Sequence, residues 1–415
     1  MEISLLPVSA GLELYRRQAE RLFEEYITGD PAVVNFIRSN HPRLRKWAEA
    51  NCPYASVTPA DIQQAMASWY YFDSWMHLVE WVAAVTQKNS AVFLFESAVE
   101  AIFNGDLTRL SALLREEPAL VKARSMRQHC ATLLHYIGAN GVEYYRGHYP
   151  ANAVEMVKIL LAAGAEVDAE ADMYHGGATT LGLVATSIHP TRAGVMYPLL
   201  EALLDGGADI DRPGAAGNGQ CAVNGCLANG RPEAADFLAR RGAMLDLEGA
   251  SGVGRLDVVR SFFNEDGSLR ASAIKVQMDR GFIWACEYGQ TAVVEFLLGK
   301  GADPAAPMDG MNSLHWAVMG GHLDTIKLLI DRNVSVETEN VYGGTALSTA
   351  FWATVNHEEV YRWPGFTDDL SVIEVLLNAG ARIEAGTLDW FERQNLPAGK
   401  KAAIEDLLQS YGAES

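Results

Sequence analysis

The chain has 415 residues, of which 49% are hydrophobic and 20% charged, and its formal net charge at pH 7 is -19. This length exceeds that of one ordinary core, and the hydrophobic content argues against large disordered regions. The excess of carboxylates argues against nucleic-acid binding, which needs a basic face, and no apolar stretch approaches the roughly 18 residues of a membrane-spanning helix.

The first residues and the cysteines are typical of a cytoplasmic protein. Residues 1–14 have neither the basic start nor the apolar length of a signal peptide. The cysteines are odd in number and scattered over apolar positions, a pattern typical of reduced thiols: Cys52, Cys130, Cys221, Cys226 and Cys286. Since no second pair completes a zinc site with Cys221 and Cys226, we expect neither a metal nor a cofactor.

Residues 1–93 are expected to form a helical N-terminal region. A helical pattern runs through residues 12–26 and stops at a glycine. The spacing from this glycine, Gly29, to Pro42 is the same as the spacing from Gly105 to Pro118. This recurrence predicts that the N-terminal region contains a diverged hairpin of the kind that follows it.

Two further helices are expected before residue 94. Thr58 precedes a proline and is a good N-cap for the first of them, and the second follows from Asp73. The many aromatic residues between 69 and 81 either pack as an end cap or line a ligand site. Packing as an end cap is the favoured interpretation.

From residue 94 onward the chain repeats. Trp284 and Gly289 return as Trp316 and Gly321, at an offset of 32 residues. The pattern within each unit predicts two short amphipathic helices, the second of which ends at a residue suited to a left-handed C-cap. These helix-ending residues are Gly164, Gly207, Gly242, Gly301, Asn333, Gly380 and Gly412. A single hairpin cannot bury its own apolar face, so neighbouring units must stack.

The sequence Asn312-Ser313-Leu314-His315, and Gly321-His322 followed by LDTIKLLIDRNVSV, resemble the ankyrin repeat family. The resemblance implies an all-α fold, with an ankyrin-repeat solenoid of helix-turn-helix units over residues 94–415. It also implies that His315 and the equivalent His135 brace neighbouring turns, in preference to a catalytic role. For the whole protein it implies a protein-interaction scaffold.

Insertions interrupt the repeats near residues 141–151, 187–198 and 354–369. They combine histidine, arginine and aromatic residues, which either pack on the edge of the array or bind a ligand or partner. Two turns also place a tyrosine before a glycine pair, which suits contact with a partner. The candidate contacts in the insertions and turns are Tyr145, Arg146, Tyr174, His175 and Tyr342.

The resemblance implies that the first helices of the units line a concave groove. Tyr136, Trp284, Trp316 and Trp352 fall in the two rows expected to face this groove, where they either belong to the core or bind a ligand. Glu287 lies among them.

Two functions remain open at this point. The first is a protein-interaction scaffold that binds a basic or amphipathic partner through its groove and turn tips. The alternative is an enzyme or binder that acts on a small molecule by non-redox, acid–base or cyclisation-type chemistry. In that alternative, Glu287 and His189 are the acid–base candidates and the insertions close a pocket.

Overall fold

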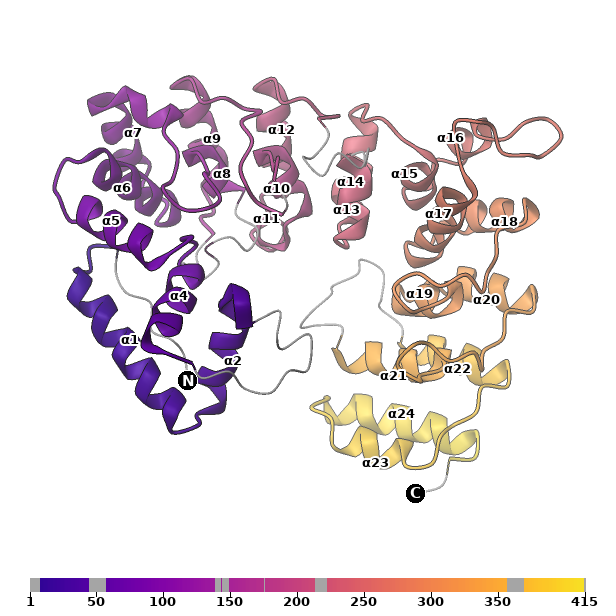
Figure 1. The fold of residues 1–415 in the computed structure, drawn as a ribbon. Coiled ribbons are helices and arrows are strands. Elements are labelled where there is room, and N and C mark those ends of the chain that lie inside the picture. The colour runs from indigo at the N-terminus through magenta and orange to yellow at the C-terminus, as the bar shows by residue number, and fades with distance from the viewer. Residues whose placement is uncertain are drawn as a thin grey trace. The chain divides into compact units, whose positions relative to one another are not determined.

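The computed structural model describes residues 8–44, 57–138, 143, 149–174, 176–212, 222–356 and 369–413. These residues form helices and isolated β-bridges, and no strand occurs among them, which confirms the all-α prediction. The chain divides into two compact units, residues 1–219 and 220–415 (Figure 1). None of the described helices is both long and apolar enough to cross a membrane.

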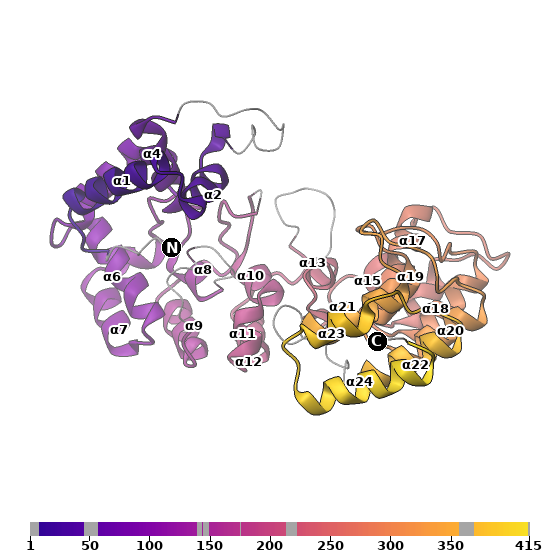
Figure 2. The ribbon, with the colours of Figure 1, turned by 90° about the horizontal axis from the view of Figure 1, so that it is seen from below.

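The first unit begins with four helices around a common core, in which Tyr15, Leu22, Ile62 and Trp81 are fully buried or nearly so. Asp30 accepts hydrogen bonds from the first backbone N–H groups of the second helix, as a capping residue should. Figure 2 shows the first three of these helices lying together. The four helices are α1 (Leu12–Ile27), α2 (Pro31–Asn40), α4 (Pro59–Trp69) and α5 (Trp75–Val85).

Stacked hairpins make up the rest of the first unit. The first helices of successive hairpins, α6, α8 and α10, pack against one another, and α7, α9 and α12 form the second row (Figure 1). The elements are α6 (Ala91–Phe103), α7 (Leu107–Glu116), η1 (Pro118–Lys122), α8 (Leu133–Ile137), α9 (Ala153–Ala162), α10 (Thr180–Thr186), α11 (Ile188–Arg192) and α12 (Met196–Asp205).

The second unit repeats this arrangement around one apolar core that runs from Leu247 to Leu408. Its first helices are α13 (Ala222–Ala228), α15 (Leu247–Gly252), α17 (Lys275–Glu287), α19 (Ser313–Met319) and α21 (Ala346–Asn356). Its second helices are α14 (Pro232–Arg240), α16 (Leu256–Ser261), α18 (Thr291–Gly299), α20 (Leu323–Asp331) and α22 (Asp369–Asn378). The last pair, α23 (Thr387–Glu392) and α24 (Ala398–Ser410), packs beside α22 (Figure 2).

The predicted helix ends are confirmed by the backbone. All seven residues expected to end a second helix have positive φ, and Asn333 (φ 61°) takes the place of glycine among them. Thr58 is the N-cap of α4 and exchanges hydrogen bonds with Asp61 in a capping box. The helix expected to follow from Asp73 begins two positions later, at Trp75, because the side chain of Ser74 caps α5.

The insertions differ from their expected bounds. Helix α21 continues to Asn356, so residues 354–356 belong to a helix, and residues 357–368 lie outside the described residues. Residues 187–198 contain the short helix α11 and the start of α12. Most of the insertion near residues 141–151 lies outside the described part, including Tyr145 and Arg146.

Candidate functional site

The expected groove aromatics in the second unit differ in accessibility. Trp284 of α17 is only 2% exposed, so the expectation that its ring faces an open groove is wrong. A Cβ atom on Gly252 of α15 would lie 2.5 Å from Leu227 Cδ1 and 3.3 Å from the Trp284 Cβ, so α15 and α17 approach closely at this glycine. The Arg280 guanidinium lies 5.7 Å from the indole centroid and covers it further.

The next two repeats expose more of their aromatic rings. Trp316 is partly buried, and its indole nitrogen donates a hydrogen bond to the Met308 carbonyl at 3.0 Å. Trp352 of α21 is 44% exposed. Of the three expected groove tryptophans, Trp352 therefore offers the most surface to a ligand.

Glu287, the last residue of α17, is buried. Burial raises the pKa of its carboxyl to about 8, a hydrogen bond with Tyr288 opposes the shift, and the Asp309 charge adds to it. The Glu287 carbonyl lies 2.9 Å from Nε2 of His322 in the following repeat. Glu287 is therefore a largely neutral carboxylic acid at pH 7.

The proposed acid–base pair divides between the two units. His189 is an exposed residue of α11 in the first unit, whereas Glu287 belongs to the second. Tyr136 also belongs to the first unit and is buried, so it does not extend the tryptophan row as an accessible ring. The groove residues expected from the sequence thus do not form one described site.

Tyr136 instead belongs to a buried polar cluster. Its hydroxyl donates to Oε1 of Glu143 at 2.8 Å, and the same oxygen lies 2.9 Å from Nε2 of His129. The Ala131 N–H donates to Nδ1 of His129, which leaves the hydrogen on Nε2 to be donated to Glu143. Glu143 is fully buried, and its charge is stabilised by these two donors.

Arg127 joins this carboxylate to a second one. Its Nη1 donates to Oε1 of Glu96 at 2.5 Å, and its Nε lies 3.6 Å from Oε1 of Glu143. The Trp81 indole also donates to Glu96, and the Arg127 guanidinium lies 4.8 Å from the centroid of that indole. We name these residues the buried ionic cluster: Trp81, Glu96, Arg127, His129, Tyr136 and Glu143.

The sequence interpretation missed the buried ionic cluster. Its members come from α5, α6, α8, the loop between η1 and α8, and Glu143 after α8, so the cluster connects the N-terminal helices to the first hairpins. One signal was present, since Glu96 interrupts an otherwise apolar face within FLFESAVEAIF.

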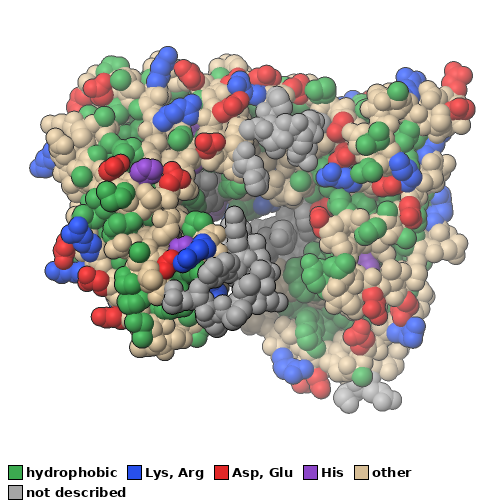
Figure 3. All heavy atoms as spheres, in the orientation of Figure 1, with side chains coloured by type: hydrophobic (Ala, Val, Ile, Leu, Met, Phe, Trp, Pro, Cys, Tyr) green, Lys and Arg blue, Asp and Glu red, His purple; other side chains and the backbone are tan. Residues whose placement is uncertain are grey.

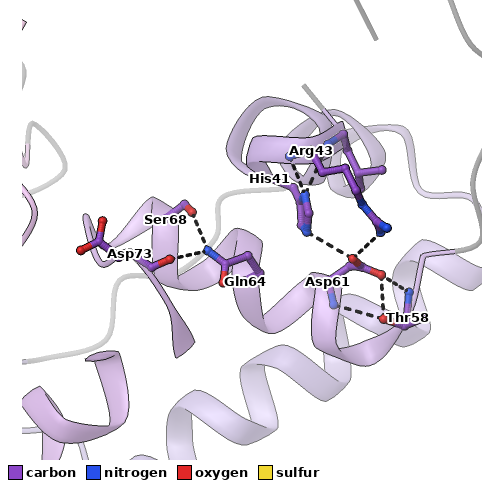
Figure 4. A network of polar contacts seen from close by, with 8 residues as sticks. His41, Arg43, Thr58, Asp61, Gln64, Ser68 and Asp73 are labelled. Carbon is purple, nitrogen blue, oxygen red and sulfur yellow. Dashed lines mark hydrogen bonds and ion pairs between the residues drawn. The ribbon is translucent and has the colours of Figure 1, made fainter. Parts of the chain in front are cut away.

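A second polar network closes the end of α2 onto the start of α4 (Figure 4). His41 Nε2 and Arg43 Nη2 lie 3.2 and 2.7 Å from the same oxygen of Asp61, and the backbone and hydroxyl of Thr58 donate to the other. Burial lowers the pKa of His41. Although burial opposes it, the hydrogen bonds from Thr58 and the charge of Arg43 hold the pKa of Asp61 below its ordinary value.

The two histidines expected to brace turns do so. Nε2 of His135 lies 3.1 Å from the Ala178 carbonyl, and Nε2 of His315 lies 3.2 Å from the Gly344 carbonyl. Each contact joins one hairpin to the loop that precedes the next. Burial lowers the pKa of His135 to about 4 and also lowers that of His315, which suits neutral, structural imidazoles.

The loop before α21 places apolar side chains in solvent. Tyr342 is 84% exposed and Val341 is 72% exposed. The Val341 N–H donates to the Gly310 carbonyl at 3.0 Å, so each loop supports the next, and Asn340 Oδ1 accepts from Tyr342 N. We name residues 308–311 and 339–343 the second-unit loop edge. On the face drawn in Figure 3, acidic and hydrophobic side chains adjoin over the second unit.

The remaining candidate tyrosine, Tyr174, is 58% exposed in the first unit, and His175 lies outside the described residues.

Comparison with known proteins identifies the repeats. A family model described as ankyrin repeats (3 copies) matches residues 282–363. No curated protein matches the chain. Among solved structures, the Bcl-3 ankyrin repeat domain, from a member of the IkappaB family, is 20% identical, covers 61% of this chain and 92% of its own, and has a TM-score of 0.31. The human ASB11 ankyrin repeat domain is 19% identical, covers 69% of this chain and 99% of its own, and has a TM-score of 0.34.

The matched segment coincides with the two hairpins α17–α18 and α19–α20 and with the start of the next. Its helices stack on the flanking hairpins of the second unit in the same two rows. The chain therefore contains ankyrin repeats over residues 282–363.

Proposed function

We propose that this protein binds a partner protein through the second-unit loop edge. Ankyrin repeats are in general protein-interaction modules. The observation that carries the proposal is the pair Val341 and Tyr342, two large apolar side chains exposed on a loop that is hydrogen-bonded to the preceding one. A rigid aromatic side chain on an ordered loop can bind with little loss of conformational entropy.

The charge of this edge favours a basic partner. Asp309 and Glu339 are exposed in the loops that carry Gly310, Val341 and Tyr342, and the Arg382 side chain is engaged by Glu337. The partner segment therefore carries lysine or arginine next to an aliphatic or aromatic side chain. Electrostatic steering by exposed carboxylates predicts association that slows as the salt concentration rises.

Selection from a displayed library of random linear peptides on the immobilised full-length chain tests this proposal. We expect basic peptides with at least one large apolar residue. Their Kd should rise at least tenfold for the Val341→Ser/Tyr342→Ala variant. The matched control is Ile27→Ser, which removes an exposed apolar side chain from the other unit.

Two results would count against this proposal. One is a selection dominated by acidic peptides. The other is a set of basic peptides whose affinity does not change in the Val341→Ser/Tyr342→Ala variant. The small-molecule alternative gains no comparable support from the described residues, because Glu287 and Trp284 are buried and His189 belongs to the other unit.

A further inference from the structure

The loop from Ser125 to Ala131 in the first unit alternates strictly between buried and exposed residues. Ser125, Arg127, His129 and Ala131 are buried, whereas Met126, Gln128 and Cys130 are exposed. The alternation arises because Arg127 and His129 reach inward to Glu96 and Glu143 of the buried ionic cluster. The inward contacts thus fix the face that the loop turns to solvent.

Neighbouring segments extend this face on both sides. The Gln128 N–H donates to the Tyr71 carbonyl at 2.7 Å, and the Gln128 side chain donates to Asp73 at 2.8 Å. On the other side, the Asp172 N–H donates to the His129 carbonyl at 2.8 Å. Three loops, one of them from the N-terminal helical region, are therefore held edge to edge.

The backbone of this region is unusually strained. Four residues here have φ between 48° and 62°, a backbone conformation that residues other than glycine and asparagine rarely adopt: Tyr71, Cys130, Glu143 and Tyr174. They make up four of the seven non-glycine residues with positive φ in the described part of the chain. Such strain persists only where surrounding contacts impose it, and it concentrates at functional sites.

We propose that these three loops form a second partner-binding surface, which recognises a basic segment carrying an aliphatic or aromatic side chain. We name it the junction surface: Tyr71, Asp73, Met126, Gln128, Asp172 and Tyr174. Tyr174 and Met126 are 58% and 47% exposed and supply apolar area, and methionine adapts to different apolar partners.

The charges at the junction surface select the occupant. Asp73 and Asp172 are both exposed, one on each side of the central loop. The Arg124 guanidinium donates to the Cys130 and Glu170 carbonyls, and the Arg127 guanidinium is buried against Glu96. Among the described residues, the ion pair recorded for Asp73 is with His77, at 3.6 Å. The carboxylates therefore favour lysine or arginine on the partner.

This inference is independent of the second-unit loop edge, because the two surfaces share no residue. The same peptide selection on the full-length chain tests it with a different variant, Met126→Ser/Tyr174→Asn. Asparagine removes the ring while tolerating the left-handed backbone at position 174. Leu14→Ser, on α1 of the same unit and 45% exposed, is the matched control.

We expect a class of selected basic peptides whose Kd rises at least tenfold in the Met126→Ser/Tyr174→Asn variant and is unchanged in Val341→Ser/Tyr342→Ala. Hydrogen exchange with a bound peptide of this class should slow at residues 125–131. The inference is overturned if every selected peptide tolerates Met126→Ser/Tyr174→Asn. It is also overturned if peptides sensitive to that variant protect other segments. In either case, peptides lost with Val341→Ser/Tyr342→Ala would still support the proposed function.

Discussion

Arg127 illustrates how a charge is kept inside this protein. Its guanidinium is buried with Glu96 and Glu143 and lies against the Trp81 ring, so each charge in the cluster has a partner. Removing one partner of a buried pair leaves an uncompensated charge, which costs far more than removing both. The cluster is therefore sensitive to single substitutions.

Arg127→Met should lower the free energy of unfolding of the first unit by roughly 3–5 kcal/mol. The Glu96→Leu/Arg127→Met double variant should recover much of this loss, because Glu143 keeps its hydrogen bonds from His129 and Tyr136. Urea unfolding measures both. Arg332→Met, which breaks an exposed pair with Glu295, is the control and should have little effect. A double variant no more stable than Arg127→Met would contradict this account.

The burial of Glu287 predicts how the stability of the second unit depends on pH. Its folded pKa of about 8 exceeds the ordinary value of 4.5, so the folded state binds the proton more tightly than the unfolded state. Stability from this group is fully present below about pH 4.5 and is lost as the pH rises through 8. At pH 9 the free energy of unfolding of Glu287→Gln, measured by urea unfolding, should therefore exceed that of the wild type by roughly 2–4 kcal/mol. The difference should shrink at pH 5.

The control for this prediction is Glu374→Gln, an exposed glutamate of α22, for which the wild-type pH dependence should persist. Equal stabilities of the wild type and Glu287→Gln at pH 9 would show that ionising the Glu287 carboxyl does not destabilise the folded state.

At the level of elements, the sequence predicted the regular features well. The helix ends at Gly301 and Asn333 and the cap at Thr58 depend on local backbone preferences that a sequence displays directly. The burial of Trp284 could not be predicted in this way. It depends on the packing of α17 against α15, which approach closely at Gly252, 32 residues earlier in the chain.

Gly320, the C-cap of α19, is a position where packing between elements forbids a side chain. A Cβ atom there would lie 2.3 Å from the Glu287 carbonyl oxygen and 2.5 Å from the His322 ring. Because the carbonyl belongs to the backbone, it cannot move aside cheaply, so Gly320→Ala should destabilise the second unit by about 1–3 kcal/mol. Thermal unfolding would measure the change.

Gly299, in the last turn of α18, is the matched comparison. No atom lies within 4 Å of a Cβ placed there, and its φ is not positive. Gly299→Ala should therefore raise stability by about 0.4–1 kcal/mol, since alanine restricts the unfolded chain and favours the helix. Similar effects of the two alanine substitutions would refute the packing argument at Gly320.

For the whole molecule, the candidate sites were harder to predict than the fold. The repeat pattern shows which faces are apolar, but the buried ionic cluster joins residues from Trp81 to Glu143 across several elements. Charged residues are normally read as exposed, so Arg127 and Glu143 gave no warning of their burial. Tyr342 was predictable as an exposed residue because it precedes a glycine pair in the turn between two hairpins.

Acid should destabilise the two units unequally. In the first unit burial holds the pKa of His135 at about 4 and also lowers that of His41. A lowered histidine pKa gives stability that is present above about pH 6.5 and lost as the pH falls towards 4, because only the unfolded state then takes up the proton. The second unit also has two histidines with lowered pKa values, His315 and His322. However, protonation of its buried Glu287 stabilises the folded second unit as the pH falls over the same range.

The measurement is urea unfolding at pH 7 and at pH 4.5, followed by a hydrogen-exchange pulse at one common pH. Peptide fragments of the labelled chain then report the unfolding of each unit separately. We expect the midpoint of the first unit to fall further on acidification than that of the second. His135→Gln should remove roughly 2–3 kcal/mol of the acid dependence of the first unit, since glutamine takes up no proton. If the second unit loses as much stability as the first, or if His135→Gln leaves the acid dependence unchanged, buried histidines do not set the acid sensitivity of this protein.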